Sequence, residues 1–201
     1  IDVKSYPKER LLNILIDKNE DINILKKKYD YIYSIKDIDG TILKLPRVID
    51  KYKKTYNKEV LVGEIGYFNN HKSCITDTSF NVVNSYTVAF LHSLGAERVT
   101  LSYELTKKQI EILIKAYEER YKANPNLELV VEGYEEVMIS KFSLNKYFNN
   151  DKIYLKDRFN NLYKIKERDN LMIIYNYKKR KDFDLSYYDI GVNSLRINKE
   201  E

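Results

Sequence analysis

The chain has 201 residues, 43% hydrophobic and 32% charged, which suits one globular domain of ordinary size. No apolar run approaches the roughly 20 residues of a membrane helix, and no signal segment opens the sequence. Its single cysteine, Cys74, excludes an internal disulfide framework. We therefore expect no membrane contact and a reducing, cytoplasmic setting. Because the chain begins with Ile1 rather than Met, we also expect a piece of a longer polypeptide.

The net charge is +5, from 35 Lys or Arg and 30 Asp or Glu. This mild excess permits weak attraction to nucleic acid without requiring it. By pattern, the chain divides into three parts. Residues 1–40 are an N-terminal segment with little pattern, residues 41–150 are a barrel-like βα region, and residues 151–201 are a hairpin with a closing strand.

The first 40 residues give two local signals. Leu11, Leu12, Ile14 and Leu15 favour a short helix, and the alternation over residues 29–35 favours a strand. Further along, four apolar runs are separated by amphipathic segments: residues 42–48, 60–65, 99–102 and 127–131. Such spacing is typical of βα units and a mainly parallel sheet.

Two helices are predicted from their ends. The first spans residues 85–94, with Asn84 as N-cap and Gly95 just past its end. The second spans residues 106–121, where Thr106 and Gln109 form a capping box. After these helices, residues 152–158 and 162–166 flank two asparagines, which predicts an antiparallel hairpin.

Residues with metal or nucleophile chemistry are sparse. His71 and His92 lie at no ligand-like spacing from each other or from Cys74, so we expect neither a zinc site nor a catalytic dyad. The segment of residues 63–66 lacks the third glycine and the Lys-Ser/Thr of a phosphate-binding loop. The sequence therefore predicts no cofactor.

Three carboxylates lie at or just past the ends of predicted strands: Asp77, Glu104 and Glu132. In a βα barrel this is the end where ligands bind, so these residues are the candidate catalytic site, for acid–base work or for holding a cation. The alternative is that they cap helices or form structural salt bridges.

A basic run near the C-terminus, residues 178–181, follows two tyrosines. The candidate nucleic-acid-binding residues are Tyr177, Lys178, Lys179 and Arg180. They could hold an RNA backbone while the tyrosine stacks on a base. The alternative is an ordinary solvated loop.

Residues 75–106 contain Asp77, Ser79, Asn81, Asn84 and Ser85, followed by Leu-Gly, Arg-Val-Thr-Leu-Ser and Tyr-Glu-Leu. This order resembles peptidase family U32, the collagenase-like proteins, with tyrosine where proline is usual. The resemblance continues through residues 128–133, 137–141, 155–158 and 191–197 and covers roughly residues 41–197.

The resemblance implies the C-terminal half of a βα barrel. Because four or five strands cannot close an eight-stranded barrel, we expect an α/β fold with a partial TIM-barrel-like parallel sheet and an antiparallel hairpin. Its open edge would be covered by residues 1–40, by a partner chain or by a missing N-terminal barrel half.

The resemblance also implies a peptidase, or an RNA- or cofactor-hydroxylating protein whose cysteines hold an iron–sulfur cluster. Glu136 and Ser143 stand where family cysteines are expected, so we expect no such cluster. Three functions stay open: a catalytically degenerate collagenase-like peptidase, a modification protein, and a non-catalytic scaffold or binding half. The substrate would be a peptide or RNA.

Overall fold

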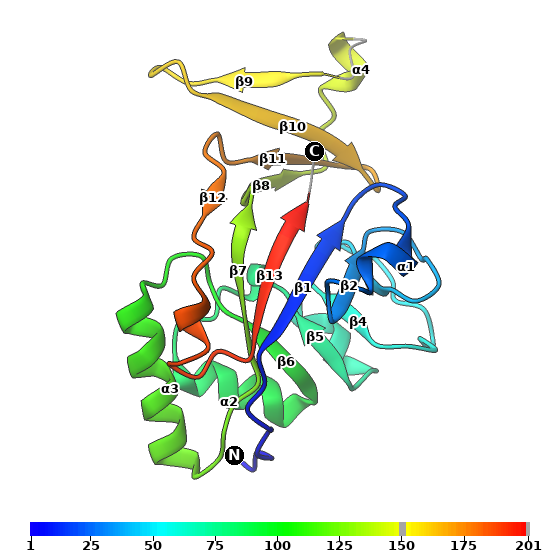
Figure 1. The fold of residues 1–201 in the computed structure, drawn as a ribbon. Helices are drawn as coiled ribbons and strands as arrows, with labels where there is room; N and C mark the ends of the chain where they lie inside the picture. The colour runs from blue at the N-terminus through cyan, green and yellow to red at the C-terminus, as the bar shows by residue number, and fades with distance from the viewer. Residues whose placement is uncertain (149–151, 200–201) are drawn as a thin grey trace. The chain divides into compact units, whose positions relative to one another are not determined.

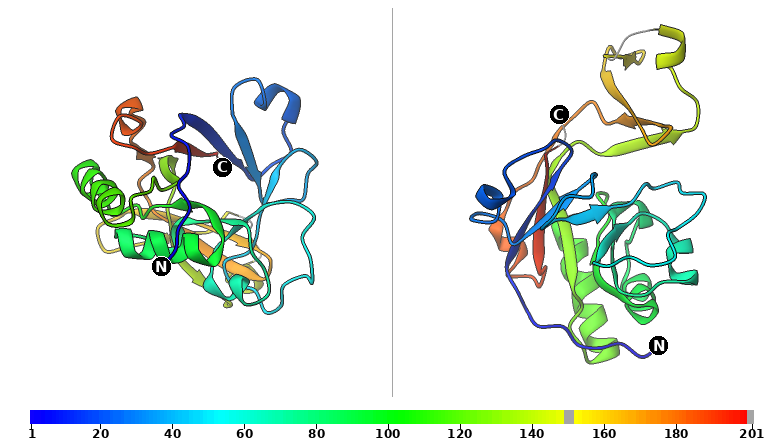
Figure 2. Two further views of the ribbon diagram at one scale, coloured as in Figure 1. Left: turned by 90° about the horizontal axis from the view of Figure 1, so that it is seen from below. Right: turned by 90° about the vertical axis from the view of Figure 1, so that its right-hand side faces the viewer.

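The computed structural model describes residues 1–148 and 152–199 and contains two compact units (Figures 1 and 2). Unit 1 comprises residues 1–131 and 182–201, and unit 2 comprises residues 132–181. The sequence patterns predicted boundaries between parts of the chain after residues 40 and 150. The second of these boundaries lies outside the described residues.

Unit 1 is built on a closed barrel of eight strands, in the spatial order β7-β13-β1-β2-β3-β4-β5-β6, with β6 paired back to β7 (Figure 1). The strands are β1 (Leu11–Ile16), β2 (Tyr31–Ser34), β3 (Ile42–Lys44), β4 (Val60–Val62), β5 (Cys74–Thr76), β6 (Ala96–Thr100), β7 (Leu127–Gly133) and β13 (Ser194–Lys199). The TIM-barrel-like α/β fold is therefore confirmed, but the expectation of a partial sheet with an open edge is wrong. The strands of residues 1–40 and the last strand complete the barrel.

The helix expected over residues 11–15 is also wrong, because these residues form β1. This strand pairs in parallel with β13 on one side and with β2 on the other. Ile14, Leu15 and Ile16 are all buried, on both faces of the strand. A strand buried on both faces is a continuous apolar run, and periodicity cannot distinguish such a run from a buried helix. The strand expected near residues 29–35 is confirmed as β2.

The two long helices have the predicted ends. Helix α2 (Ser85–Leu94) begins at the N-cap Asn84 and ends at Gly95, whose φ of 113° suits glycine. Helix α3 (Lys107–Tyr121) begins with the Thr106–Gln109 capping box. The helices contact each other outside the barrel, where α2 also packs on β6 (Figure 2). In the described part of the chain, no helix has the length and apolarity needed to cross a bilayer.

The crossovers on the other side of the barrel are short or irregular. They contain α1 (Ile22–Leu25) and a 3₁₀ helix, η1 (Ile65–Asn69). A second 3₁₀ helix, η2 (Thr78–Phe80), precedes α2 in the crossover from β5 to β6. Between β3 and β4 the chain is a loop, from which Tyr52 and Tyr56 pack against a cluster that includes Val60 and Val62. Tyrosines of this loop thus cover part of the barrel where a crossover helix is usual.

Unit 2 is a four-stranded sheet in the order β8-β11-β10-β9, with antiparallel neighbours. Its elements are β8 (Glu136–Ser140), α4 (Asn145–Phe148), β9 (Tyr154–Lys156), β10 (Leu162–Arg168), β11 (Leu171–Tyr175) and β12 (Arg180–Lys181). The predicted hairpin is confirmed as β9 and β10, with Asn160 at a φ of 67° in the turn. Ile165, Met172 and Ile174 form the core of the unit.

Candidate functional site

A network of polar side chains lies inside the barrel, beside an apolar cluster of Leu15, Tyr33, Leu61 and Ile75. Apolar layers alone usually fill barrels of this kind. The polar side chains come from different strands: Asn13, Tyr33, Lys44, Asp77, Arg98, Glu128 and Arg196. Each interrupts or ends an apolar strand, and apart from Lys44 each is buried. Burying such groups costs free energy unless they form hydrogen bonds or ion pairs with one another.

Arg196 lies at the centre of this network, with a side chain that has no exposed surface. Its Nη2 donates to Asp77 Oδ1 at 2.5 Å, and its Nη1 lies 3.1 Å from Glu128 Oε1. The guanidinium also lies 5.3 Å from the centre of the Tyr33 ring. Burial lowers the pKa of Arg196, but the two carboxylates outweigh this effect and raise it overall. The arginine is therefore a permanently charged bridge between two buried acids.

Glu128 accepts hydrogen bonds at both carboxylate oxygens. Asn13 Nδ2 and Tyr33 Oη donate to Oε2 at 2.6 and 2.8 Å, and Thr100 Oγ1 donates to Oε1 at 3.1 Å. Tyr33 Oη in turn accepts from Arg98 Nη1 at 3.2 Å. The network is thus continuous from Arg98 through Glu128 and Arg196 to Asp77.

Asp77 follows β5 and is the predicted catalytic residue that joins this network. Besides Arg196, it has Lys44 Nζ at 3.4 Å and the backbone N–H of Thr78 at 2.8 Å. Burial raises the pKa of Asp77, but Arg196 and Lys44 outweigh burial and hold it well below the usual value. A general base works best with a pKa near the operating pH, so this carboxylate is a weak base.

The other two predicted carboxylates have different surroundings. Glu104 is exposed on the turn between β6 and α3, where its backbone N–H donates to Ser102 Oγ at 3.3 Å. Glu132 lies near the end of β7, in unit 2, and forms a 2.8 Å ion pair with Lys179. The carboxylates of Asp77 and Glu132 therefore have different partners, and the contact of Glu104 is made by its backbone.

Comparison with known families bears on the barrel. The sequence profile of peptidase family U32 matches residues 11–164. This chain belongs to peptidase family U32. A search of curated proteins and a search of solved structures each found no significant match. The family match begins at Leu11, in β1, so this U32 member shares with its family the first strands that sequence reasoning left outside the resemblance.

The iron–sulfur cluster implied by some U32 proteins does not fit the residues of this chain. At the two positions where cysteines are expected, Ser143 Oγ donates to Glu167 and Glu136 lies 3.6 Å from Arg168. The thiol of Cys74 is fully buried in β5, and burial raises its pKa to about 12. These groups do not supply the thiolates that hold such clusters.

The predicted nucleic-acid-binding residues lie in unit 2, where two of the cations are paired with carboxylates. Lys179 pairs with Glu132, and Arg180 Nη1 lies 3.7 Å from Glu135 Oε1. Lys178 is exposed, and Tyr177 is half-exposed with its ring edge-on to Tyr163 at 5.4 Å. Because carboxylates neutralise two of its cations, the basic run of residues 178–181 offers less positive charge to a nucleic acid than its sequence indicates.

Sequence reasoning missed a second basic feature of unit 2, on β10. Lys164, Lys166 and Arg168 alternate with Ile165, which belongs to the core, so they lie on the opposite face of the strand. Tyr154 of β9 is the direct partner of Lys164, which places it on the same face. The alternating Lys-Ile-Lys-Glu-Arg pattern of residues 164–168 is the sequence signal from which this basic face could have been predicted.

Proposed function

We propose that this U32 member does not hydrolyse peptides and instead binds single-stranded RNA through unit 2. The observation that carries the proposal is the distribution of charge. Residues 132–181 contain twelve Lys or Arg and seven Asp or Glu, an excess of five, which equals the +5 of the whole chain. The remaining residues are balanced. Positive charge concentrated in one unit attracts a phosphate backbone.

Exposed aromatic rings accompany this charge. Six large exposed aromatic side chains belong to unit 2: Phe142, Tyr147, Phe148, Tyr154, Phe159 and Tyr177. Phe142 and Tyr147 stack on each other at 5.4 Å, and Arg158 lies 4.7 Å from the ring centre of Phe159. Exposed rings among cations suit single strands, because unpaired bases can stack on them.

The β9–β10 face has both components at adjacent positions. Tyr154 is half-exposed and lies opposite Lys164, and Lys166 follows two residues along β10 on the same face. A base stacked on Tyr154 would place its phosphate within reach of the two lysines. Duplex RNA presents its bases less openly, so this arrangement favours a single strand.

The absence of hydrolysis is supported by the barrel. Asp77 is held as a charged partner of Arg196 and Lys44, and the Cys74 thiol is kept buried and protonated. Neither suits acid–base or nucleophilic catalysis. The U32 barrel then serves as a scaffold for unit 2.

The binding test is fluorescence anisotropy with a labelled oligouridine of about 20 nucleotides, measured across a salt series. The double variant Lys164→Gln/Lys166→Gln is expected to weaken binding and to reduce the salt slope by about 1.4, since each single-strand phosphate contact contributes about 0.7. Tyr154→Ala should weaken binding roughly tenfold, and Tyr154→Phe should not, because phenylalanine keeps the stacking surface.

The matched control is Lys108→Gln/Lys115→Gln on α3, which removes the same charge from unit 1. If the two double variants weaken binding equally, or if the wild type does not bind at low salt, the RNA proposal is wrong. Hydrolysis is tested separately with fluorescent casein. Casein cleavage that disappears in Asp77→Asn would contradict the non-hydrolytic part.

A further inference from the structure

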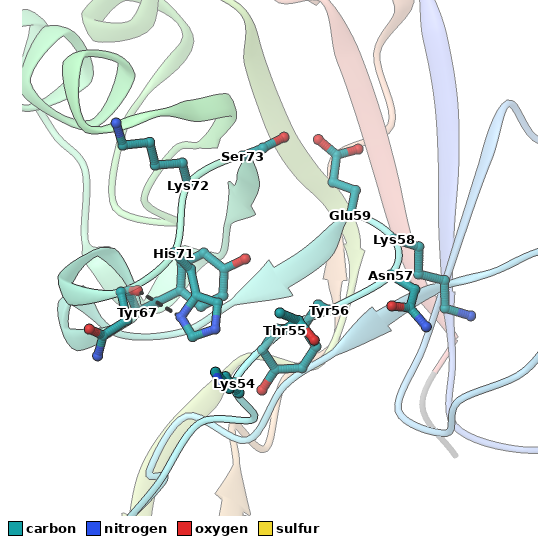
Figure 3. Close-up of a pocket in the computed structure, with 11 residues that line it drawn as sticks. Lys54, Thr55, Tyr56, Asn57, Lys58, Glu59, Tyr67, His71, Lys72 and Ser73 are labelled. Atoms are coloured by element: carbon teal, nitrogen blue, oxygen red, sulfur yellow. Dashed lines mark hydrogen bonds between the residues drawn. The ribbon is translucent and has the colours of Figure 1, made fainter.

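Unit 1 has a surface hollow outside the barrel, between the loop that leads into β4 and the segment that leads into β5 (Figure 3). Its volume is about 450 Å³. A second hollow of about 880 Å³ adjoins it and shares Lys54, Asn70 and His71 with it. A loop connects β3 to β4, and the short 3₁₀ helix η1 lies between β4 and β5, so no α-helix covers the barrel on this side.

Aromatic rings form one wall. The Tyr67 and His71 rings stack with centroids 4.7 Å apart, and the Tyr56 ring lies 5.4 Å from His71 at a 58° tilt. Tyr67 is buried, but Tyr56 and His71 are partly exposed. Because these two rings are too close for another ring to enter between them, a flat ligand would lie on their outer surface.

The rim is basic. Lys54, Lys58 and Lys72 line the hollow together with a single carboxylate, Glu59. Lys58 is paired with Asp37 at 2.8 Å. In Figure 3, Lys54 lies beside the Tyr56 and His71 rings, whereas the side chain of Lys72 points away from them. Burial raises the pKa of Glu59, which disfavours its charged form. The rim is therefore positive overall.

Two backbone carbonyl oxygens hold the His71 ring in place. Its Nδ1 lies 3.3 Å from the carbonyl oxygen of Tyr67, and its Nε2 lies 2.8 Å from that of Lys53. Because carbonyl oxygens only accept hydrogen bonds, these two contacts fix the orientation of the imidazole ring. The His71 ring is therefore a fixed part of the aromatic wall.

We propose that this hollow is a binding site for a small anion that carries a flat ring, of the nucleoside monophosphate type. The ring lies on the Tyr56 and His71 surface, and the phosphate lies by Lys54, toward which the long, flexible side chain of Lys72 would turn. The volume of the hollow falls within the range of small-molecule sites, about 300 to 1,000 Å³. This site is separate from the barrel network and does not depend on RNA binding by unit 2.

The test is an NMR titration of the full chain with AMP, observed at the Hε1 protons of the imidazoles. The chain has two histidines, and His92 is buried, so His92 is an internal control. We expect AMP to shift the His71 signal and to leave His92 unchanged, with a Kd on the order of 0.1 to 1 mM. Adenosine and inorganic phosphate, titrated separately, should each bind at least tenfold more weakly.

Two variants locate the binding site. Lys54→Ala/Lys72→Ala should weaken AMP binding roughly tenfold, because two cations near the phosphate are lost. Lys108→Ala/Lys115→Ala, on α3, should leave the affinity unchanged. If AMP does not shift His71, or if both double variants weaken binding equally, the site is wrong. If inorganic phosphate binds as tightly as AMP, the requirement for a ring is wrong.

Discussion

Arg196 and Asp77 are 119 residues apart in sequence, yet they share a 2.5 Å hydrogen bond inside the barrel. Arg196 has no exposed side-chain surface and Asp77 has very little. The pair connects β13 with the end of β5, two strands that are not neighbours in the barrel. Through its second nitrogen Arg196 also reaches Glu128 on β7. One side chain therefore joins β13 both to its neighbour β7 and to the end of β5, a strand that is not its neighbour.

Arg196→Met is expected to lower the free energy of unfolding by about 3 to 5 kcal/mol, because it leaves Asp77 and Glu128 as buried charges without their main partner. Urea denaturation, followed by circular dichroism, measures the free energy of unfolding of each variant. The control is Arg10→Met, which breaks an exposed ion pair with Asp189 and should cost less than about 1 kcal/mol. Adding Asp77→Asn and Glu128→Gln to Arg196→Met should recover part of the loss. Equal effects of Arg196→Met and Arg10→Met would show that the network contributes little.

Because His92 is buried, we expect the folded protein to lose stability in mild acid. Burial lowers the pKa of His92 to about 4, from an ordinary value near 6.5. Its Nδ1 donates to the Ala96 carbonyl oxygen at 2.6 Å, and its Nε2 accepts from the Asn126 backbone N–H at 3.3 Å. One donating and one accepting nitrogen is the pattern of a neutral imidazole. The unfolded chain therefore binds a proton that the folded chain does not.

Because the folded pKa is depressed, the stability that neutral His92 provides is complete above about pH 6.5 and falls as the pH drops toward 4. The loss from this group is roughly 3 kcal/mol at most. We expect His92→Gln to be less stable than the wild type at neutral pH but to have a flatter stability profile between pH 7 and 4, in urea titrations at several pH values. A variant profile as steep as that of the wild type would contradict this prediction.

Cys74 is expected to be unreactive in the folded protein. Its thiol is fully buried on β5, and its raised pKa keeps it protonated near neutral pH. Ellman's reagent at about pH 8 should therefore react slowly with the native chain and quickly, with one thiol per chain, in denaturant. Fast reaction under native conditions would mean that this strand opens readily.

Local signals in the sequence determined the helices and the hairpin. The N-caps Asn84 and Thr106, and the Asn160 turn, act over a few residues, so their chemistry is visible without the fold. The charge of unit 2 is likewise a property of composition. The ordered motifs of residues 75–106 were enough to indicate the U32 family, which the family match confirms.

Only the tertiary structure decided that the barrel closes and what lies inside it. Strands β3, β4 and β5 have three residues each, and β1 is buried on both faces, so none has the alternation by which a strand is recognised. The partners of Arg196 come from β7 and from the residue that follows β5, and a sequence does not state which distant strands become neighbours or face each other in a barrel. For the same reason the sequence grouped Asp77 with Glu104 and Glu132, because it specified their positions along strands but not the cations that Asp77 would meet on folding.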